Sequence, residues 1–317
     1  MTGNRTSSLV ARYRLLLPAL ALMLLLPLPA LAWNAAGHRL VASIAWDQLD
    51  EHTRSELSQL LRSHPDYARW LRRTGDDQTG RGAFIEASTW PDDIRKDTRF
   101  YSAGIDNPTA TLPGFPDMER RRDWHYLNRP LDDALGNQTV SGLLDKQLVA
   151  LAKIIGSTSA PQIERVYALP WLIHLIGDAH QPLHTSIRLD ADGKWDKLGS
   201  GMTVINPFNS RKSSSTLHTF WDDLPGPPWL RGERLTAASQ ALIASYPHPA
   251  HSTSGQWINE SWRIARKSAY PPGAENVPTI SEEFYENARK IANQRIAEAG
   301  YRLADLLREL LSTKLKR

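Results

Sequence analysis

Histidine and aspartate recur at a helical spacing in the second half of the chain. His174 and Asp178 lie four residues apart in an apolar stretch that begins at Trp171, so a helix would place both side chains on one buried face. Burying an imidazole beside a carboxylate costs free energy unless the two groups pair or bind a metal ion. Taken alone, the stretch also fits a hydrogen-bonded His–Asp pair in the core, which is the more common reading of such a pattern.

The same spacing returns at His218 and Asp222, although this spacing also occurs by chance on helices. Zinc accepts imidazole nitrogen and carboxylate oxygen, and a catalytic zinc site keeps one position open for water. The chain has no cysteine, so any zinc would have to use histidine, aspartate and glutamate. The candidate side chains are too many for one zinc ion and suit two or three. They are His38, Asp92, His125, His174, Asp178, His184, His218 and Asp222.

Apolar periodicity predicts helices for most of the chain. One helix ends near Leu49 and holds His38 in its first turn or two. The others are expected at about 53–62, 139–155, 161–180, 217–222, 233–245, 254–267 and 281–313, with loops at 101–120 and 185–216. A short strand pair is plausible near Met202 to Ile205. The sequence therefore predicts a single, mainly helical all-α domain with long loops and at most a small β-hairpin.

Two proline positions affect the candidate ligands. Pro91 predicts that the residue before it is extended or ends a helix, so Asp92 stands at a break. There Asp92 could point into a site, or it could cap the N-terminus of a helix. Pro182 ends the helix that carries His174, and His184 follows on the turn.

Residues 1–32 read as a secretory signal peptide. Arginines precede an apolar run from Leu15 to Leu28, and Ala30-Leu31-Ala32 matches the small-x-small cleavage pattern. We expect cleavage before Trp33, which would leave residues 33–317 as one domain in the periplasm or outside the cell, with no membrane contact. An uncleaved anchor is the alternative, but the run is short for a bilayer span.

Charge excludes one class of function. Removing residues 1–32 takes away three arginines, so 35 of the 38 basic residues remain against 34 acidic ones, a net charge of +1. A nearly neutral protein is not built for long-range steering onto duplex DNA. It could still hold phosphates locally through metal ions or a few arginines. The run Arg120–Arg122 fits a solvated face better than a phosphate site.

Four segments resemble motifs of the S1/P1 nuclease family, in the family's order. They are Trp90-Pro91-Asp92-Asp93-Ile94-Arg95, Trp124-His125-Tyr126-Leu127-Asn128, His174-x3-Asp178-x5-His184 with Gln181-Pro182-Leu183, and Leu217-His218-x2-Trp221-Asp222. The matching motifs extend from Trp33 to Asp222. After Asp222 the resemblance depends only on the predicted pattern of helices. It implies a bacterial member of a family with an all-α fold, three zinc ions in one cleft and a mature chain that begins with tryptophan.

The resemblance also implies a ligand set for three zinc ions. One ion would be bound by the amine and carbonyl of Trp33 together with His38. A second would be bound by Asp92, His125 and His174, and Asp178 would bridge these two ions. The third ion would be held by His184, His218 and Asp222. Signal cleavage would then have a chemical role, because a peptide-bonded nitrogen is a poor ligand and a free amine is a good one.

The chemistry implied by the resemblance is phosphodiester hydrolysis. A water between two close zinc ions becomes hydroxide near neutral pH and attacks phosphorus in line. Asp92 and Asp178 would hold the ions, while Arg95 matches the family's phosphate-contacting arginine. The expected substrates are single-stranded DNA and RNA, cut to 5′-phosphorylated products, with 3′-nucleotidase activity as well. Tyr126 falls where the family stacks a base and Asn128 where it recognises one. We expect a monomer.

Two other readings remain open. A zinc-dependent phospholipase C shares the fold, the metal cluster and the N-terminal tryptophan. In that branch the first histidine lies farther from the tryptophan and the last ligand is typically glutamate, so His38 and Asp222 favour the nuclease. A non-catalytic exported zinc-binding protein would need the ligands but not Arg95. The loop 190–201 follows the family pattern loosely, and Asn128 replaces an aspartate of some relatives, so base preference does not carry over.

Overall fold

The computed structural model of the chain describes residues 33–312, apart from 76–77, 133–138, 191 and 274–276. The predicted signal peptide, residues 1–32, lies outside the described residues, so its cleavage stays a prediction. Within the described residues, no helix has both the length and the hydropathy that a membrane span requires.

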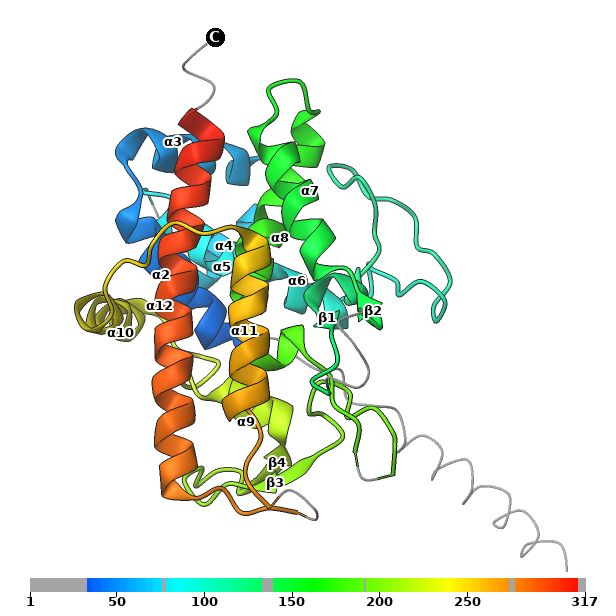
Figure 1. Cartoon of the computed structure of the whole chain (residues 1–317). Coiled ribbons are helices and arrows are strands. Elements are labelled where there is room, and N and C mark those ends of the chain that lie inside the picture. The colour runs from blue at the N-terminus through cyan, green and yellow to red at the C-terminus, as the bar shows by residue number, and fades with distance from the viewer. Residues whose placement is uncertain (1–32, 76–77, 133–138, 191, 274–276, 313–317) are drawn as a thin grey trace, which may run out of the picture. The chain divides into compact units, whose positions relative to one another are not determined.

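The described residues are mainly helical, as the sequence predicts (Figure 1). The α-helices are α2 Ala35–Gln48, α3 Glu51–Arg62, α4 Tyr67–Thr74, α5 Arg81–Ala87, α6 Trp90–Asp93, α7 Leu144–Gly156, α8 Gln162–Ala179, α9 Leu217–Asp223, α10 Gly232–Ser245, α11 Ser254–Ser268 and α12 Glu282–Ser312. Single turns of 3₁₀-helix are η1 Ile94–Lys96, η2 Arg122–His125 and η4 Pro182–Thr185.

Two small antiparallel strand pairs accompany the helices. The expected pair is β3 Thr203–Ile205 with β4 Ser214–Thr216. A second pair, β1 Leu127–Asn128 with β2 Ser141–Gly142, was not expected. It delays the helix predicted from 139, which begins only at Leu144 because the preceding residues are in a strand. The fold class is nevertheless confirmed as one mainly helical domain.

The environment of Asp92 differs from the expectation. Trp90 and Pro91 form the first turn of α6, and Thr89 takes the N-cap position. Proline is tolerated there because the first N–H groups of a helix have no intrahelical partner. Asp92 therefore lies inside a helical turn and is not an N-cap.

The helix α8 forms the centre of the core. Every residue from Val166 to Ala179 is buried, and α2, α3, α5, α6, α7 and α12 all pack against this helix. A helix that is apolar on all sides must be covered on all sides. Within this buried part of α8, the side chains of His174 and Asp178 have no exposed surface.

Two arginines of α12 hold the C-terminal end of α8. Arg302 donates to Nε2 of His180 over 2.9 Å, and Arg295 donates to the carbonyl of His180 over 3.4 Å. Glu260 of α11 accepts hydrogen bonds from both arginines. Because the last carbonyls of a helix lack intrahelical partners, these donors fix the direction in which the chain leaves α8.

The contact between α12 and α2 depends on one glycine. A Cβ at Gly300 would lie 2.5 Å from Cγ2 of Ile44 and 3.1 Å from the carbonyl oxygen of Val41. Such distances leave no room for a methyl group unless the helices move apart. The position of α2, and with it that of His38, therefore depends on the absence of a side chain on α12.

Gly300→Ala should lower the free energy of unfolding by about 1–3 kcal/mol, because the added methyl overpacks the contact with Ile44. Urea denaturation measures this. Gly255→Ala is the matched control, since a Cβ in that part of α11 meets only Oγ1 of Thr253, at 4.0 Å. The control should be neutral or stabilising by up to about 1 kcal/mol. Equal effects of the two substitutions would contradict this account of the packing.

Candidate metal centre

Three groups of histidine and aspartate side chains gather at the C-terminal part of α8 and the segments around it. Within each group, one potential ligand atom from every residue lies within 4.8 Å of the others. The groups are His38, His174 and Asp178; Asp92, His125 and His174; and His184, His218 and Asp222. The structure thus brings together the eight side chains that the sequence singled out, from segments far apart along the chain.

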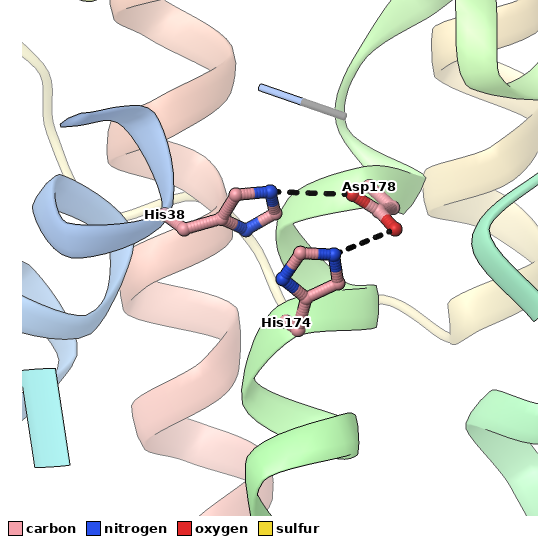
Figure 2. Close-up of side chains that lie close together, drawn as sticks. All are labelled: His38, His174 and Asp178. Atoms are coloured by element: carbon pink, nitrogen blue, oxygen red, sulfur yellow. Dashed lines mark ion pairs between the residues drawn. The ribbon is translucent and has the colours of Figure 1, made fainter. Parts of the chain in front are cut away.

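Asp178 lies between two imidazoles, one from α2 and one from its own helix (Figure 2). Nε2 of His38 is 3.5 Å from Oδ1 of Asp178, and Nε2 of His174 is 3.3 Å from Oδ2. The two imidazole rings stack with centroids 3.8 Å apart. Each carboxylate oxygen thus faces a different histidine, which is the arrangement that a bridging ligand requires.

A third histidine completes a triangle of donor atoms. Nδ1 of His125 lies 3.0 Å from Oδ2 of Asp178 and 3.1 Å from Nε2 of His174, and the third side of the triangle is 3.3 Å. A tetrahedral zinc ion with bonds of about 2.0–2.1 Å keeps its ligand atoms about 3.3 Å apart. Asp92 is at the edge of this triangle, with Oδ1 4.0 Å from Nε2 of His174. The donor set and its spacing therefore fit zinc.

The third group consists of His184, His218 and Asp222. Nδ1 of His184 is 2.6 Å from the carbonyl of His125, and Nδ1 of His218 is 2.7 Å from the carbonyl of Leu198. A carbonyl can only accept, so both Nδ1 atoms carry hydrogen, and in the neutral rings both Nε2 atoms would be the metal-binding nitrogens. These Nε2 atoms are 3.3 Å apart, and Oδ2 of Asp222 is 3.3 Å from the one on His218.

Backbone carbonyls and a side-chain amide orient the candidate ligands by hydrogen bonds to atoms that do not face the centre of the group. Nδ1 of His174 donates to the carbonyl of Ser88 over 2.8 Å, which leaves Nε2 to face Asp178. The amide of Gln181 donates to Oδ1 of Asp222 over 2.9 Å. Metal-binding histidines and carboxylates characteristically have such supporting partners. A backbone carbonyl such as that of Ser88 leaves no signal in residue types, so sequence reasoning could not identify it.

Burial shifts the protonation equilibria of the cluster. It raises the pKa of Asp178 to about 6, against the lowering influence of His174, and raises the pKa of Asp222 well above its ordinary value. Burial, followed by nearby positive groups, lowers the pKa of His38 and His125 well below the usual range. Both ring nitrogens of His38 and Nε2 of His125 are buried without a hydrogen bond among the described residues. These nitrogens are available as neutral ligands.

The predicted substrate contacts lie beside this cluster. Nε of Arg95 is 3.2 Å from Oδ1 of Asp92, so its guanidinium adjoins a candidate ligand. Tyr126 directly follows His125 and is partly exposed. Asn128 donates from its amide to Oγ of Ser141 over 2.8 Å, while its Oδ1 makes no hydrogen bond among the described residues.

Trp33 is fully buried at the start of the described chain. The next residue, Asn34, donates from its backbone N–H to the carbonyl of Asp222 over 3.1 Å. The side chain of Asn34 also accepts from the backbone N–H of Ala36 and so caps α2. These contacts fix the backbone at Trp33 next to the segment that carries the last candidate ligand.

Comparisons with known proteins agree with this geometry. The family described as S1/P1 Nuclease matches residues 33–312. Endonuclease 5 of Arabidopsis thaliana is 24% identical over 308 residues, covering 90% of this chain and 93% of the relative. Endonuclease 1 of the same plant is 25% identical over 300 residues, with coverages of 89% and 88%. Nuclease S1 of Aspergillus oryzae is 24% identical over 319 residues, with coverages of 91% and 95%.

One residue that the sequence analysis missed is Gly177, next to Asp178 on α8. A Cβ there would lie 2.8 Å from Nδ1 of His38. A glycine in the middle of a helix costs about 1 kcal/mol relative to alanine, which is the signal that could have identified it. Because Gly177 has no side chain, the ring of His38 can lie close to α8.

Gly177→Ala should weaken metal binding by about 10- to 100-fold, because the methyl group displaces His38 from Asp178. Competition between the protein and a coloured zinc chelator measures the affinity. Gly255→Ala, which fills open space, should leave the affinity unchanged. An unaltered affinity in Gly177→Ala would mean that the approach of His38 to α8 has no part in metal binding.

Proposed function

Because the chain belongs to the S1/P1 nuclease family, we propose that it is a zinc-dependent endonuclease for single-stranded DNA and RNA. Its products would be 5′-phosphorylated, and it would also remove 3′-phosphates from nucleotides. The observation that carries this proposal is the gathering of three groups of histidine and aspartate, in each of which the potential ligand atoms lie within 4.8 Å of one another. Relatives that bear the names Endonuclease and Nuclease S1 support the reaction class.

We propose three zinc ions per chain, held by the residues of the three groups. His38 and the backbone of Trp33 would bind the first, Asp92, His125 and His174 the second, and His184, His218 and Asp222 the third, with Asp178 between the first two. All these ligands come from one chain, so a monomer would hold a complete site. Zinc, when bound there, would act as a Lewis acid and lower the pKa of water.

The side chains around the ions would position the substrate. Arg95 is nearly buried beside Asp92, so its guanidinium is restricted to the edge of the cluster, where it would donate to phosphoryl oxygens. Tyr126 would stack a base, and the unpaired Oδ1 of Asn128 would accept from one. Single strands suit such a site because an unpaired base can leave its stack.

The test of this function is hydrolysis of single-stranded DNA by the mature protein, with products identified by mass. We expect 5′-phosphorylated products, no reaction after chelation and recovery with zinc. Arg95→Ala should lower kcat by about 10²–10³ with zinc content unchanged, since a donor to the charged phosphoryl group is lost. Arg95→Lys should restore part of the rate, because lysine keeps the charge without the planar fork.

Arg62→Ala, which removes an exposed arginine of α3, is the matched control and should have normal activity. A protein that binds zinc but cleaves no nucleic acid contradicts the nuclease. Release of the phosphorylated headgroup from lecithin by the same sample would instead favour the phospholipase C.

We also propose that the chain is exported and cut before Trp33, so that the free amine becomes a ligand. The buried Trp33 side chain and the bond from Asn34 to Asp222 support a fixed position for that amine. Protein recovered from the periplasm or medium should have the mass of residues 33–317. A version carrying one verified residue before Trp33 should bind less zinc; full zinc content and activity would show that the amine is not a ligand.

A further inference from the structure

The turn at residues 197–199 is held in an unusual backbone conformation. Three successive residues have φ in the left-handed region, with values of 53° at Lys197, 63° at Leu198 and 80° at Gly199. Glycine adopts this region without a steric penalty, whereas Lys197 and Leu198 carry a Cβ that makes it costly. Contacts from the surrounding chain must therefore hold the turn in this shape.

This turn meets the start of α9 in two places. The carbonyl oxygen of Leu198 accepts from Nδ1 of His218 over 2.7 Å, and the carbonyl oxygen of Gly199 accepts from the backbone N–H of His218 over 3.3 Å. With the hydrogen on Nδ1, the nitrogen of the neutral ring that can bind a metal ion is Nε2, which lies 3.3 Å from Oδ2 of Asp222. The turn thus sets both the tautomer and the orientation of a candidate ligand.

A single buried side chain, that of Asp196, ties the turn to the preceding part of the loop. Its Oδ2 accepts from the backbone N–H of Gly199 over 3.1 Å, and its Oδ1 accepts from the backbone N–H of Arg188 over 3.0 Å. The main-chain carbonyl of Asp196 also accepts from the backbone N–H of Gly201 over 2.8 Å. Because Asp196 is only 4% exposed, water has little access to replace these bonds.

Tyr270, which follows α11, fixes the carboxyl group of Asp196 from another part of the fold. Its hydroxyl donates to Oδ2 over 2.6 Å. Burial, followed by the charge of Asp196, raises the pKa of Tyr270 well above its ordinary value, so the hydroxyl keeps the hydrogen that it donates. The guanidinium of Arg188 lies 4.0 Å from the centre of the Tyr270 ring, which holds the ring against the same loop.

We propose that Asp196 and Tyr270 are positioning residues for the third metal group, an inference that rests on the proposed zinc site. Tyr270 orients the carboxyl group of Asp196, and that group holds the N–H of Gly199. The turn then presents the carbonyl of Leu198 to Nδ1 of His218. Partners of this kind, which act through the second nitrogen of a metal-binding histidine, contribute about 10- to 100-fold to metal affinity.

The first measurement is the release of zinc from the loaded mature protein to a coloured chelator. Tyr270→Phe removes one hydroxyl and keeps the ring, so it should weaken the binding of one ion about 10- to 100-fold and that of the others by less than about twofold. Asp196→Asn replaces an acceptor oxygen by an amide donor and should weaken the same ion further. His218→Gln identifies which step of the release belongs to the third group.

The second measurement reads the tautomer of His218 directly, by NMR of protein with isotope-labelled histidine in the presence of chelator. The parent should carry the ring hydrogen on Nδ1, and Tyr270→Phe should increase the share of the tautomer with hydrogen on Nε2. Tyr301→Phe is the matched control, because it also removes a buried hydroxyl that donates to a backbone carbonyl, that of Tyr246 over 3.1 Å. The control should change neither readout.

Equal weakening of all ions in Tyr270→Phe, or an unchanged release of zinc, would overturn the positioning role. Weaker binding of the third ion with an unchanged tautomer of His218 would reject the route through Leu198. If the parent binds no zinc, the metal proposal fails, and the tautomer in Tyr270→Phe alone decides whether the turn positions His218. A parent that binds zinc but cleaves no nucleic acid would contradict only the nuclease.

Discussion

Two imidazole nitrogens that both present lone pairs repel each other at 3.3 Å unless a cation lies between them. Nε2 of His184 and Nε2 of His218 lie at this distance, and Nδ1 of each ring donates to a backbone carbonyl. Asp222 places a carboxyl oxygen near the same point, and Gln181 donates a hydrogen bond to that carboxyl group. In the other two groups, imidazole nitrogens and carboxyl oxygens also lie within 4.8 Å of one another. A divalent cation bound to each group would neutralise charge that is otherwise costly to bury.

The fold brings the candidate ligands together and holds them close to one another. The candidate ligands come from α2, α6, η2, α8, η4 and α9, which lie far apart in the sequence. Ions bound to them would tie these elements together, which has a structural value in a chain without cysteine. Helix α12 supports the arrangement from outside, through Gly300 against α2 and through its arginines at the end of α8. The buried pair Arg39 and Glu86, 2.7 Å apart, holds α5 to α2 next to His38.

Much of this was accessible from the sequence, because the side chains that would bind metal are rare residue types at helical spacing. His174 and Asp178 share a face for the simple reason that four residues make about one turn, and the apolar residues around them predict burial. The order of the motifs along the chain then indicated that distant residues such as His38 and Asp92 belong to the same site. The proline before Asp92 was misread, since Pro91 proved to be part of a first helical turn instead of a break.

The supporting contacts could not be read from the sequence because many of them are backbone groups. The carbonyl that accepts from His218 belongs to Leu198, whose φ of 63° is unusual for a residue with a side chain and turns the loop toward the site. The loop 190–201, which follows the family pattern loosely, thus contributes an orienting group.

The central claim is that the facing imidazoles and carboxylates exist to hold metal ions. Crystals of the mature protein, measured on both sides of the zinc absorption edge, test it most directly. The account predicts three anomalous peaks, one at each His–Asp group. The peak between His184, His218 and Asp222 is the one whose position the account predicts most closely. The same side-chain positions with no anomalous peak among them would contradict the account.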